Sequence, residues 1–304
     1  MSYALICPGQ GSQYIGMGKE FYDFDNDFKE KYDIASNILG YDISKISFDG
    51  PIDTLKKTQY TQPAIFIHSY LSALLIKNYS KIKFSIGAGH SLGEITALAV
   101  ANSISYVDAI NLIKVRSNSM AEAGEKMPGA MAAIIGANDE QLAEICDQSG
   151  IVVPANINAP NQVVISGETE AVKLAIKDAK LMGLRRVIPL NVSGAFHSPL
   201  MFDARDELIN IINKIKFNDA DFPVVQNVTA KPSMKKEGIK KNLILQLENP
   251  VKWSQSIKNI YKIGINKFIE CGPGKVLSGL NRKILKNSIN YSINTPQNMD
   301  QFES

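Results

Sequence analysis

The chain has 304 residues, of which 45% are hydrophobic and 21% charged, and its formal net charge at pH 7 is +3. This composition is typical of a globular protein with enough chain for one large or two modest domains. The net charge is small, and the sequence has no basic stripe with interleaved aromatic residues, so we expect no nucleic-acid partner. No apolar run approaches about 18 residues, so we expect no membrane span.

The N-terminal third begins with an apolar run, Tyr3–Cys7, that predicts a strand and leads into a loop with two glycines. Further on, Thr61 is placed to cap a helix with Pro63 in its first turn, and this helix continues to Asn78. The helix is apolar on nearly every side, which predicts burial. We expect His68 within it to be a core histidine whose ring nitrogens are satisfied.

Gly89-His90-Ser91-Leu92-Gly93 fits Gly-x-Ser-x-Gly, the strand-to-helix turn that exposes a nucleophilic serine. A short apolar run, Phe84–Ala88, precedes it as a buried parallel strand should, and Glu94–Asn102 follows with helical spacing. The two glycines allow strand and helix to approach closely. An ordinary turn is the alternative, and the flanking elements favour Ser91 as a nucleophile.

The next helix, Tyr106–Ala123, places Arg116 inside its own apolar stripe. A guanidinium that faces a core is costly unless it meets an anion. Two partners fit: a carboxylate of the protein, or a substrate carboxylate held by two hydrogen bonds.

The middle of the chain follows the order βαββαβ, which is the pattern of a ferredoxin-like unit. We therefore expect an α/β fold: an α/β-hydrolase-like large domain with a parallel sheet, residues 1–125 and 196–304, and an inserted ferredoxin-like subdomain, residues 126–195. No Pro/Ser-rich linker separates the two, so we expect them to pack together. The predicted elements of the insertion are Gly129–Ile135, Asp139–Gln148, Val152–Asn158, Gln162–Ser166, Glu168–Met182 and Arg185–Leu190.

The rest of the chain returns to the large domain. We predict a helix at Met201–Ile215, strands at Val224–Val228 and Lys267–Cys271, and a last helix from Val276. The tail after about Asn287 is polar, and we expect it to be loose. The intervening Gly-Pro-Gly-Lys lacks the spacing of a phosphate-binding loop, which argues against nucleotide hydrolysis.

A serine hydroxyl needs an adjacent base, and the chain has only three histidines. His197 follows Ser91 in the order of α/β-hydrolases and lies in a loop after a predicted strand, so we favour it over the alternative of a surface histidine. His90 is adjacent to Ser91 in the chain, where neighbouring side chains diverge. No acidic residue has a distinguishing context, and a backbone carbonyl would serve to orient the imidazole instead.

Oxyanion stabilisation in such folds uses the N–H that follows the nucleophile, here that of Leu92, and a second donor from a loop after an early strand. The loop around Gln10 is a candidate for that donor, although a simple tight turn would also explain its glycines.

Three distant cysteines form no Cys-x-x-Cys pair, which argues against a disulfide framework and a zinc site. We expect reduced thiols in a cytoplasmic protein, and the N-terminus lacks the pattern of a signal peptide.

Several motifs, taken together and in order, make the chain resemble the malonyl-CoA:acyl-carrier-protein transacylases of fatty-acid synthesis. The resemblance runs from residue 3 to about residue 285. It rests on Cys7-Pro8-Gly9-Gln10-Gly11-Ser12-Gln13, Tyr60-Thr61-Gln62-Pro63-Ala64, Gly89 to Glu94, Arg116, Gly194-Ala195-Phe196-His197-Ser198, Asn249-Pro250-Val251-Lys252-Trp253 and Gly272-Pro273-Gly274-Lys275-Val276-Leu277.

The resemblance implies that Ser91 is the acylated nucleophile and His197 its base. It also implies that Gln10 and the Leu92 N–H form the oxyanion hole, and that the main-chain carbonyl of Gln246 orients the histidine. That carbonyl would account for the missing acid.

The resemblance further implies that Arg116 binds the malonyl carboxylate, and that Gln62 and Asn158 line the cleft. In related polyketide acyltransferases, phenylalanine before the histidine accompanies malonyl selection, so Phe196 favours malonyl. Asn161 stands where the family usually has glycine, and we expect little consequence because asparagine tolerates positive φ.

The implied reaction moves a malonyl group from malonyl-CoA to the phosphopantetheine thiol of acyl carrier protein, through a malonyl-serine ester. It needs no metal or redox cofactor, since coenzyme A leaves as a product and the phosphopantetheine belongs to the carrier. We expect a monomer whose partners are malonyl-CoA and the carrier. Three lysine pairs are placed to steer an acidic carrier or simply to be solvated: Lys56-Lys57, Lys235-Lys236 and Lys240-Lys241.

Three other functions compete with this one. A serine (thio)esterase would use the same turn and histidine but leaves Arg116 without a role. A stand-alone acyltransferase of a polyketide synthase would share the chemistry and differ in its carrier. A non-catalytic scaffold is disfavoured because Ser91, His197 and Arg116 are all present.

Overall fold

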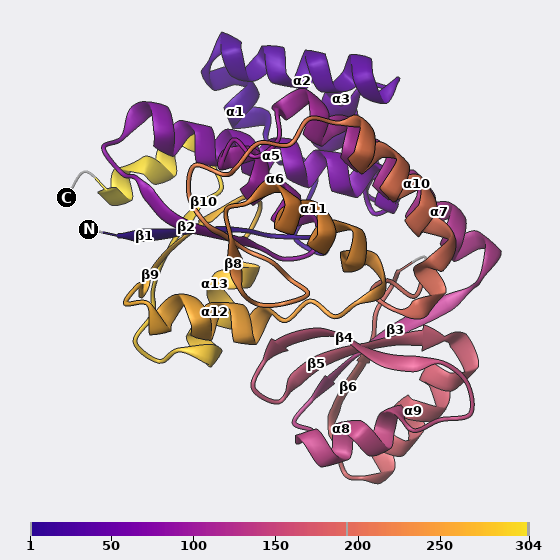
Figure 1. Cartoon of the computed structure of the whole chain (residues 1–304). Coiled ribbons are helices and arrows are strands. Elements are labelled where there is room, and N and C mark those ends of the chain that lie inside the picture. Colours follow the sequence, from indigo (N-terminus) through magenta and orange to yellow (C-terminus); the bar gives the residue numbers. More distant parts are fainter. Residues whose placement is uncertain (1, 193, 303–304) are drawn as a thin grey trace.

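A computed structural model describes residues 2–192 and 194–302 and contains two sheets, each with its own helices (Figure 1). The larger sheet has the order β10-β9-β1-β2-β7-β8. Its neighbouring strands pair in parallel, except that β8 runs antiparallel to β7. The strands are β1 Tyr3–Cys7, β2 Phe84–Gly89, β7 Val224–Val225, β8 Pro232–Ser233, β9 Lys267–Cys271 and β10 Ile289–Ile293.

The register of the central strands sets the position of the serine turn. Cys7 at the end of β1 pairs with Gly89 at the end of β2, and Ala88 pairs with Val225 of β7. Carboxyl ends of parallel strands meet at one edge of a sheet, where α/β proteins bind their ligands. The turn after β2, the glycine loop after β1 and the chain after β7 therefore meet at this edge.

Helices cover both faces of the larger sheet. The long buried helices α5 (Thr58–Tyr79), α6 (Leu92–Val100) and α7 (Tyr106–Lys126) lie on one face, and α12 (Trp253–Lys262) and α13 (Val276–Ile284) lie on the other (Figure 1). The remaining helices of this part are α1 Lys19–Phe24, α2 Asn26–Leu39, α3 Ile43–Asp49, α4 Ile52–Leu55, α10 Phe202–Lys214 and α11 Lys236–Leu245, with 3-10 turns at Pro199–Met201, Gln246–Glu248 and Pro296–Phe302. None of the helices described is both long enough and apolar enough to cross a membrane.

The smaller sheet is antiparallel and has the order β4-β5-β3-β6, which is the strand order of a ferredoxin-like unit. Helices α8 and α9 cover its outer face (Figure 1). This arrangement, together with the parallel sheet, confirms the predicted fold class. The elements are β3 Gly129–Ile135, α8 Asp139–Cys146, β4 Val152–Ala159, β5 Gln162–Glu168, α9 Thr169–Leu181 and β6 Arg186–Pro189.

The inner face of the smaller sheet joins the core of the larger part. Met131 and Ala133 of β3 belong to the main hydrophobic cluster, whereas Ala132 and Ile134, one position along, pack with α8 and α9. This alternation is the period of a strand. Main-chain hydrogen bonds also join the smaller sheet to the larger part: Val251 donates its N–H to Ala155 O at 2.8 Å and accepts from the Ile157 N–H at 2.9 Å.

Three sequence predictions are wrong in detail. Helix α5 begins at Thr58, so Pro63 lies inside the helix and not in its first turn. The predicted strand at 224–228 ends at Val225, because Gln226 closes a turn that includes Ala230 at φ 54°. The tail is not loose in the part that the structure describes, since residues 289–293 pair with β9 as an edge strand. An edge strand needs only one buried face, so the alternation of polar and apolar residues in 289–293 is compatible with pairing to β9.

Candidate active site

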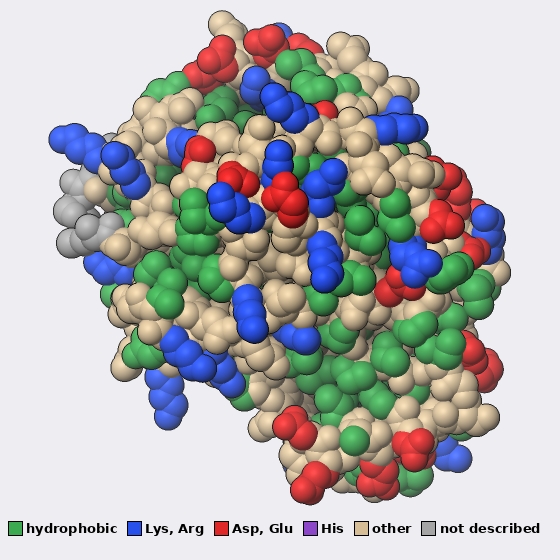
Figure 2. Space-filling model, in the orientation of Figure 1, with side chains coloured by type: hydrophobic (Ala, Val, Ile, Leu, Met, Phe, Trp, Pro, Cys, Tyr) green, Lys and Arg blue, Asp and Glu red, His purple; other side chains and the backbone are tan. Residues whose placement is uncertain are grey.

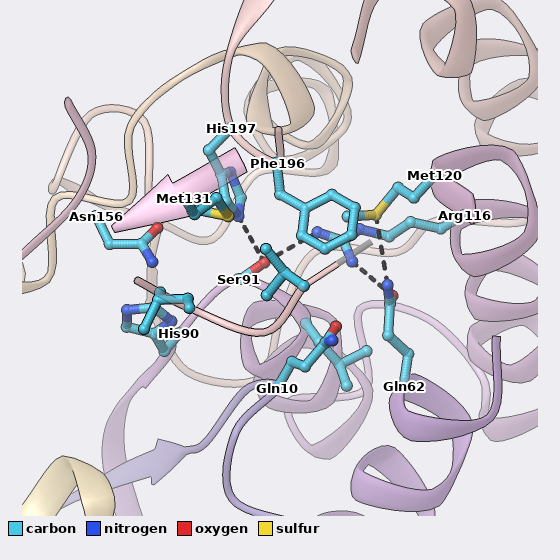
Figure 3. Close-up of a pocket in the computed structure, with 13 residues that line it drawn as sticks. Gln10, Gln62, His90, Ser91, Arg116, Met120, Met131, Asn156, Phe196 and His197 are labelled. Atoms are coloured by element: carbon cyan, nitrogen blue, oxygen red, sulfur yellow. Dashed lines mark hydrogen bonds between the residues drawn. The ribbon is translucent and has the colours of Figure 1, made fainter. Parts of the chain in front are cut away.

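Ser91 lies between the end of β2 and the start of α6, with a backbone φ of 52° and ψ of −109°. Its Oγ and the Nε2 of His197 are 2.8 Å apart, and their side chains point toward one another in the cavity (Figure 3). A close approach of main chains makes this turn possible. A Cβ at Gly93 would lie 2.0 Å from the carbonyl oxygen of Cys7, which explains the glycine there.

The second ring nitrogen of His197 faces two main-chain carbonyls. Nδ1 lies 2.9 Å from the oxygen of Gln246 and 3.2 Å from that of Asn249. Because carbonyl oxygens only accept, Nδ1 must carry the proton, which leaves Nε2 as the acceptor for the Ser91 hydroxyl. Burial, aided by the positive charge of Arg116, lowers the pKa of His197 to about 3. The ring is therefore neutral at pH 7 and able to accept a proton.

Arg116 is 2% exposed, and its guanidinium lies beside the nucleophile (Figure 3). It donates to Gln62 Oε1 at 2.5 Å, to Ser91 Oγ at 3.0 Å and to Gln246 Oε1 at 3.0 Å. Burial lowers its pKa to about 10, against the opposing negative charge of Glu94. The ion pairs of the described residues do not include this arginine. Of the two partners expected for it, a protein carboxylate is thus not in contact, and the cation faces neutral oxygens in the cavity.

The two predicted oxyanion donors both line this cavity. Leu92 is the first residue of α6, so its N–H is among those left free at a helix N-terminus. The Oε1 of Gln10 accepts from Thr58 Oγ1 at 3.2 Å, so its NH2 group remains as a donor.

The walls of the cavity are mostly apolar and come from both parts of the molecule. Met131, Leu190 and Val192 belong to or adjoin the smaller sheet. The full lining is Gln10, Gln62, His90, Ser91, Leu92, Arg116, Met120, Met131, Asn156, Leu190, Val192, Phe196 and His197.

The two predicted cleft residues occupy different places. Gln62 lies in the cavity, where its amide bridges Arg116 and Thr58. Asn158 lies outside it, in an adjoining hollow that also includes Gln10 and Lys56. There Asn158 Oδ1 is 2.8 Å from His90 Nε2, so His90 is bonded away from the serine hydroxyl.

Sequence reasoning missed two buried residues that hold the turn. Asn227 bonds the main chain of Ser91, and Glu94 bonds the main chain of Asn227 and the side chain of Gln246. Signals for both were present. Asn227 closely follows a parallel strand at the ligand-binding edge, and Glu94 is the one charged residue in the apolar run Leu92–Val100.

The lysine pairs differ in their surroundings. Lys56 and Lys57 line a further hollow that adjoins the cleft. Lys235 instead pairs with Asp219 at 2.7 Å, and Lys240 lies over the ring of Phe217. The face in Figure 2 carries basic and acidic side chains scattered over the larger part, and further acidic side chains at the far end of the smaller part. Among the residues described, no three His, Cys, Asp or Glu side chains are grouped to hold a metal ion.

Comparison with known proteins extends these observations. The model of a family described as "Acyl transferase domain" matches residues 4–296. A malonyl CoA-acyl carrier protein transacylase of Bacillus subtilis is 40% identical over 301 residues, covering 98% of this chain and 95% of the relative. One of Staphylococcus aureus is 39% identical over 296 residues, covering 96% and 95%.

Solved structures agree with this. A malonyl-transacylase in complex with its type II polyketide synthase acyl carrier protein has a TM-score of 0.95 at 37% identity, covering 99% of this chain and 98% of that one. The transacylase of Clostridium perfringens has a TM-score of 0.93 at 35% identity, covering 100% and 96%.

Proposed function

The chain belongs to the acyl transferase family, among the malonyl-CoA:acyl carrier protein transacylases, and we propose that it performs their transfer through an ester on Ser91. The enzyme is an acyltransferase that moves malonyl groups from malonyl-CoA to acyl carrier protein for fatty-acid synthesis. The observation that supports the serine ester is the chain of contacts from Gln246 O through His197 to Ser91 Oγ, with Arg116 beside the same oxygen.

In the first half-reaction the Ser91 oxygen attacks the thioester carbonyl while His197 Nε2 takes the hydroxyl proton. The bond from oxygen to carbon forms, and the negative charge moves to the carbonyl oxygen. The Leu92 N–H and the Gln10 amide stabilise that oxygen, each contributing about 3–4 kcal/mol. When the tetrahedral intermediate collapses, the carbon–sulfur bond breaks, and coenzyme A leaves with the proton from His197.

In the second half-reaction the phosphopantetheine thiol of the carrier gives its proton to His197 and attacks the malonyl ester. The bond from carbon to the Ser91 oxygen breaks, and the serine recovers the proton. Each proton that His197 accepts is thus returned within the same half-reaction, and the scheme needs no metal or redox cofactor.

Arg116 selects the acyl group in this proposal. A malonyl carboxylate replaces its contacts with neutral oxygens by a bidentate ion pair in a buried place, where such pairs are strong. An acetyl group leaves the guanidinium without an anion. Gln62 supports the arginine, and the rings and thioethers of Phe196, Met120 and Met131 shield the ester from water.

The test is intact-mass analysis after brief incubation with malonyl-CoA. We expect an added malonyl group on the wild type and on Ser80→Ala, a matched change at the distant end of α5, and none on Ser91→Ala. A wild-type enzyme that stays unmodified, or a Ser91→Ala variant that still carries the adduct, contradicts the proposal. Release of free malonate that does not fall when carrier is added would identify a hydrolase instead.

The carrier is the one point on which the solved structures favour a second candidate, because one similar protein was solved with a polyketide carrier. A competition between a fatty-acid carrier and a type II polyketide carrier for the malonyl-enzyme decides this. We expect faster transfer to the fatty-acid carrier.

We also place the enzyme in the cytoplasm, since its three cysteines are free and two of them, Cys7 and Cys271, are buried.

A further inference from the structure

The serine turn is held in a conformation that its own residues disfavour. Ser91 has a positive φ without being glycine, a strained conformation that persists only when surrounding contacts impose it. The glycines at 89 and 93 permit the turn but cannot hold it. Other contacts must supply the constraint.

Asn227 makes those contacts from the chain that follows β7. It is 2% exposed, and its side-chain Oδ1 accepts from the Ser91 N–H at 2.8 Å while Nδ2 donates to the Gly89 carbonyl at 2.6 Å. One amide group thus bridges both sides of the turn. The donor and acceptor requirements of the two main-chain groups determine which way the amide faces.

Glu94 anchors this bridge and extends it to the histidine. Its Oε2 accepts from the main-chain N–H of Asn227 at 2.7 Å and from Nε2 of Gln246 at 3.1 Å. The same Nε2 lies 3.2 Å from the carbonyl oxygen of Ser91. Because the carbonyl of Gln246 orients His197, a single carboxylate connects the positions of nucleophile and base.

Burying a carboxylate at this position has a high desolvation cost. Glu94 is fully buried, and its Oε1 has no hydrogen-bond partner among the described residues. Burial raises its pKa to about 7, against the opposing effects of its hydrogen bonds and of Arg116. Neither Glu94 nor Asn227 lines the cavity, so neither can touch the malonyl group. Any effect on the transfer must therefore pass through Ser91, Gln246 or Arg116.

We propose that Glu94 and Asn227 are positioning residues: they hold the Ser91 turn and the Gln246 carbonyl in a fixed relation, which keeps Ser91 Oγ within reach of His197 Nε2. This inference rests on the proposed role of Ser91. It predicts loss of the acylation rate with little change in substrate binding, because misplacing a reacting atom by about 1 Å can cost on the order of 100-fold in rate.

The experiment measures single-turnover acylation by malonyl-CoA, followed by intact mass, over a range of substrate concentrations. For Asn227→Ala we expect the limiting rate to fall about 100-fold and the half-saturating concentration to stay within about twofold. The limiting rate of Glu94→Ala should fall by a similar factor. Glu94→Gln keeps an oxygen acceptor for both N–H groups, and its limiting rate should be at least tenfold higher than that of Glu94→Ala.

Matched controls separate positioning from general damage. Glu270 is also buried, and it accepts the main-chain N–H groups of Leu277 at 2.9 Å and Ser278 at 2.7 Å at the start of α13. Asn281 is a buried asparagine in the same helix. Glu270→Gln and Asn281→Ala should lower thermal stability without slowing acylation by more than about twofold.

Each outcome decides the inference. Wild-type acylation rates in folded Asn227→Ala and Glu94→Ala overturn it, as does a raised half-saturating concentration at an unchanged limiting rate. If an alanine variant does not fold, Asn227→Asp replaces it, because aspartate keeps the acceptor for the Ser91 N–H and loses the donor to the Gly89 carbonyl. A normal limiting rate in folded Asn227→Asp then overturns the inference. If the wild type itself forms no malonyl adduct, the proposed function fails, and this result is distinct from the failures above.

Discussion

At the scale of single residues, the positive charge of Arg116 is the feature that most separates this site from that of a hydrolase. The guanidinium is buried, and it donates to the nucleophilic oxygen itself and to two amide oxygens. A buried cation that meets only neutral oxygens is poorly compensated, and an arriving carboxylate completes it. Burial, aided by the same charge, lowers the pKa of the nearby His197 and keeps it in its neutral form.

Replacing Arg116 therefore affects the two acyl groups differently. In Arg116→Ala, the second-order rate of enzyme acylation by malonyl-CoA should fall about 100- to 1000-fold, which corresponds to about 3–4 kcal/mol of lost pairing. Acylation by acetyl-CoA should change by less than about tenfold. Both rates are measured by intact mass, with the exposed Arg186→Ala as control. Equal losses for the two substrates would remove Arg116 from acyl selection.

His68 is a second residue for which burial dominates. The sequence predicts a core histidine with satisfied nitrogens. The structure buries the ring, and neither nitrogen makes a hydrogen bond of standard geometry among the described residues, although the backbone of Asn294 lies near enough to interact with the ring. Burial lowers its pKa to about 3, with the backbone of Asn294 opposing in part. The edge of the ring meets Phe21 with centroids 5.2 Å apart, so His68 behaves as a packed aromatic group.

This burial predicts acid sensitivity. Between about pH 6.5 and pH 3 the unfolded chain binds a proton at His68 that the folded protein does not, so stability falls as pH falls through that window. The slope for one such group approaches about 1.4 kcal/mol per pH unit. In urea titrations, His68→Leu should therefore lose less stability than the wild type between pH 7 and pH 5. Comparison at pH 8, where the histidine is neutral in both states, corrects for packing changes, and parallel curves at all pH values would refute this.

At the scale of elements, helix α5 shows how tertiary structure repairs a local fault. Pro63 in its interior has no N–H to donate to the carbonyl of Gln59, four residues earlier. The hydroxyl of Tyr41 donates to that carbonyl at 2.8 Å. A side chain from before α3 thus supplies the missing donor, so the helix passes through the proline without leaving that carbonyl unpaired.

The repair is testable by a double-mutant cycle. Tyr41→Phe should lower the free energy of unfolding by about 1 kcal/mol, since it leaves the Gln59 carbonyl unpaired. In a Pro63→Ala background the alanine N–H can take over, and the cost of Tyr41→Phe should fall toward zero. Tyr106→Phe is the control, because its hydroxyl bonds the unrelated carbonyl of Lys31. Equal costs of Tyr41→Phe in both backgrounds would show that the two residues are independent.

At the scale of the whole molecule, the two sheets share a core and a cavity. Met131 of β3 packs into the main hydrophobic cluster and also lines the cavity at Ser91. Val251 ties β4 to the larger part through two main-chain hydrogen bonds. The boundaries at residues 125/126 and 195/196, like the monomeric state, stay predictions.

This coupling predicts one cooperative unfolding transition. Trp253, the single tryptophan, is buried in the larger part and reports on it by fluorescence. Hydrogen exchange of peptides from β3 and β5 reports on the smaller sheet. The two probes should give the same urea midpoint, because separation would expose the inner face that carries Met131 and Ala133. A lower midpoint for the β3 and β5 peptides would show that the insertion unfolds on its own.

From the sequence alone, the elements around the site and its central residues follow from local chemistry. The glycine spacing around Ser91, the charge of Arg116 within an apolar stripe and the scarcity of histidines all act over a few positions or by composition. The order of strands and helices likewise predicts a parallel sheet with a ferredoxin-like insertion. These signals need no knowledge of which distant segments meet.

Only the tertiary structure decided which groups hold that chemistry in place. Asn227 reaches the main chain of Ser91 from 136 positions away, and Gln246 bonds Glu94 across 152 positions. Such contacts have no period and no local motif. They arise because parallel strands bring the segments that follow them to one edge of the sheet, where buried polar groups must pair with whatever lies opposite.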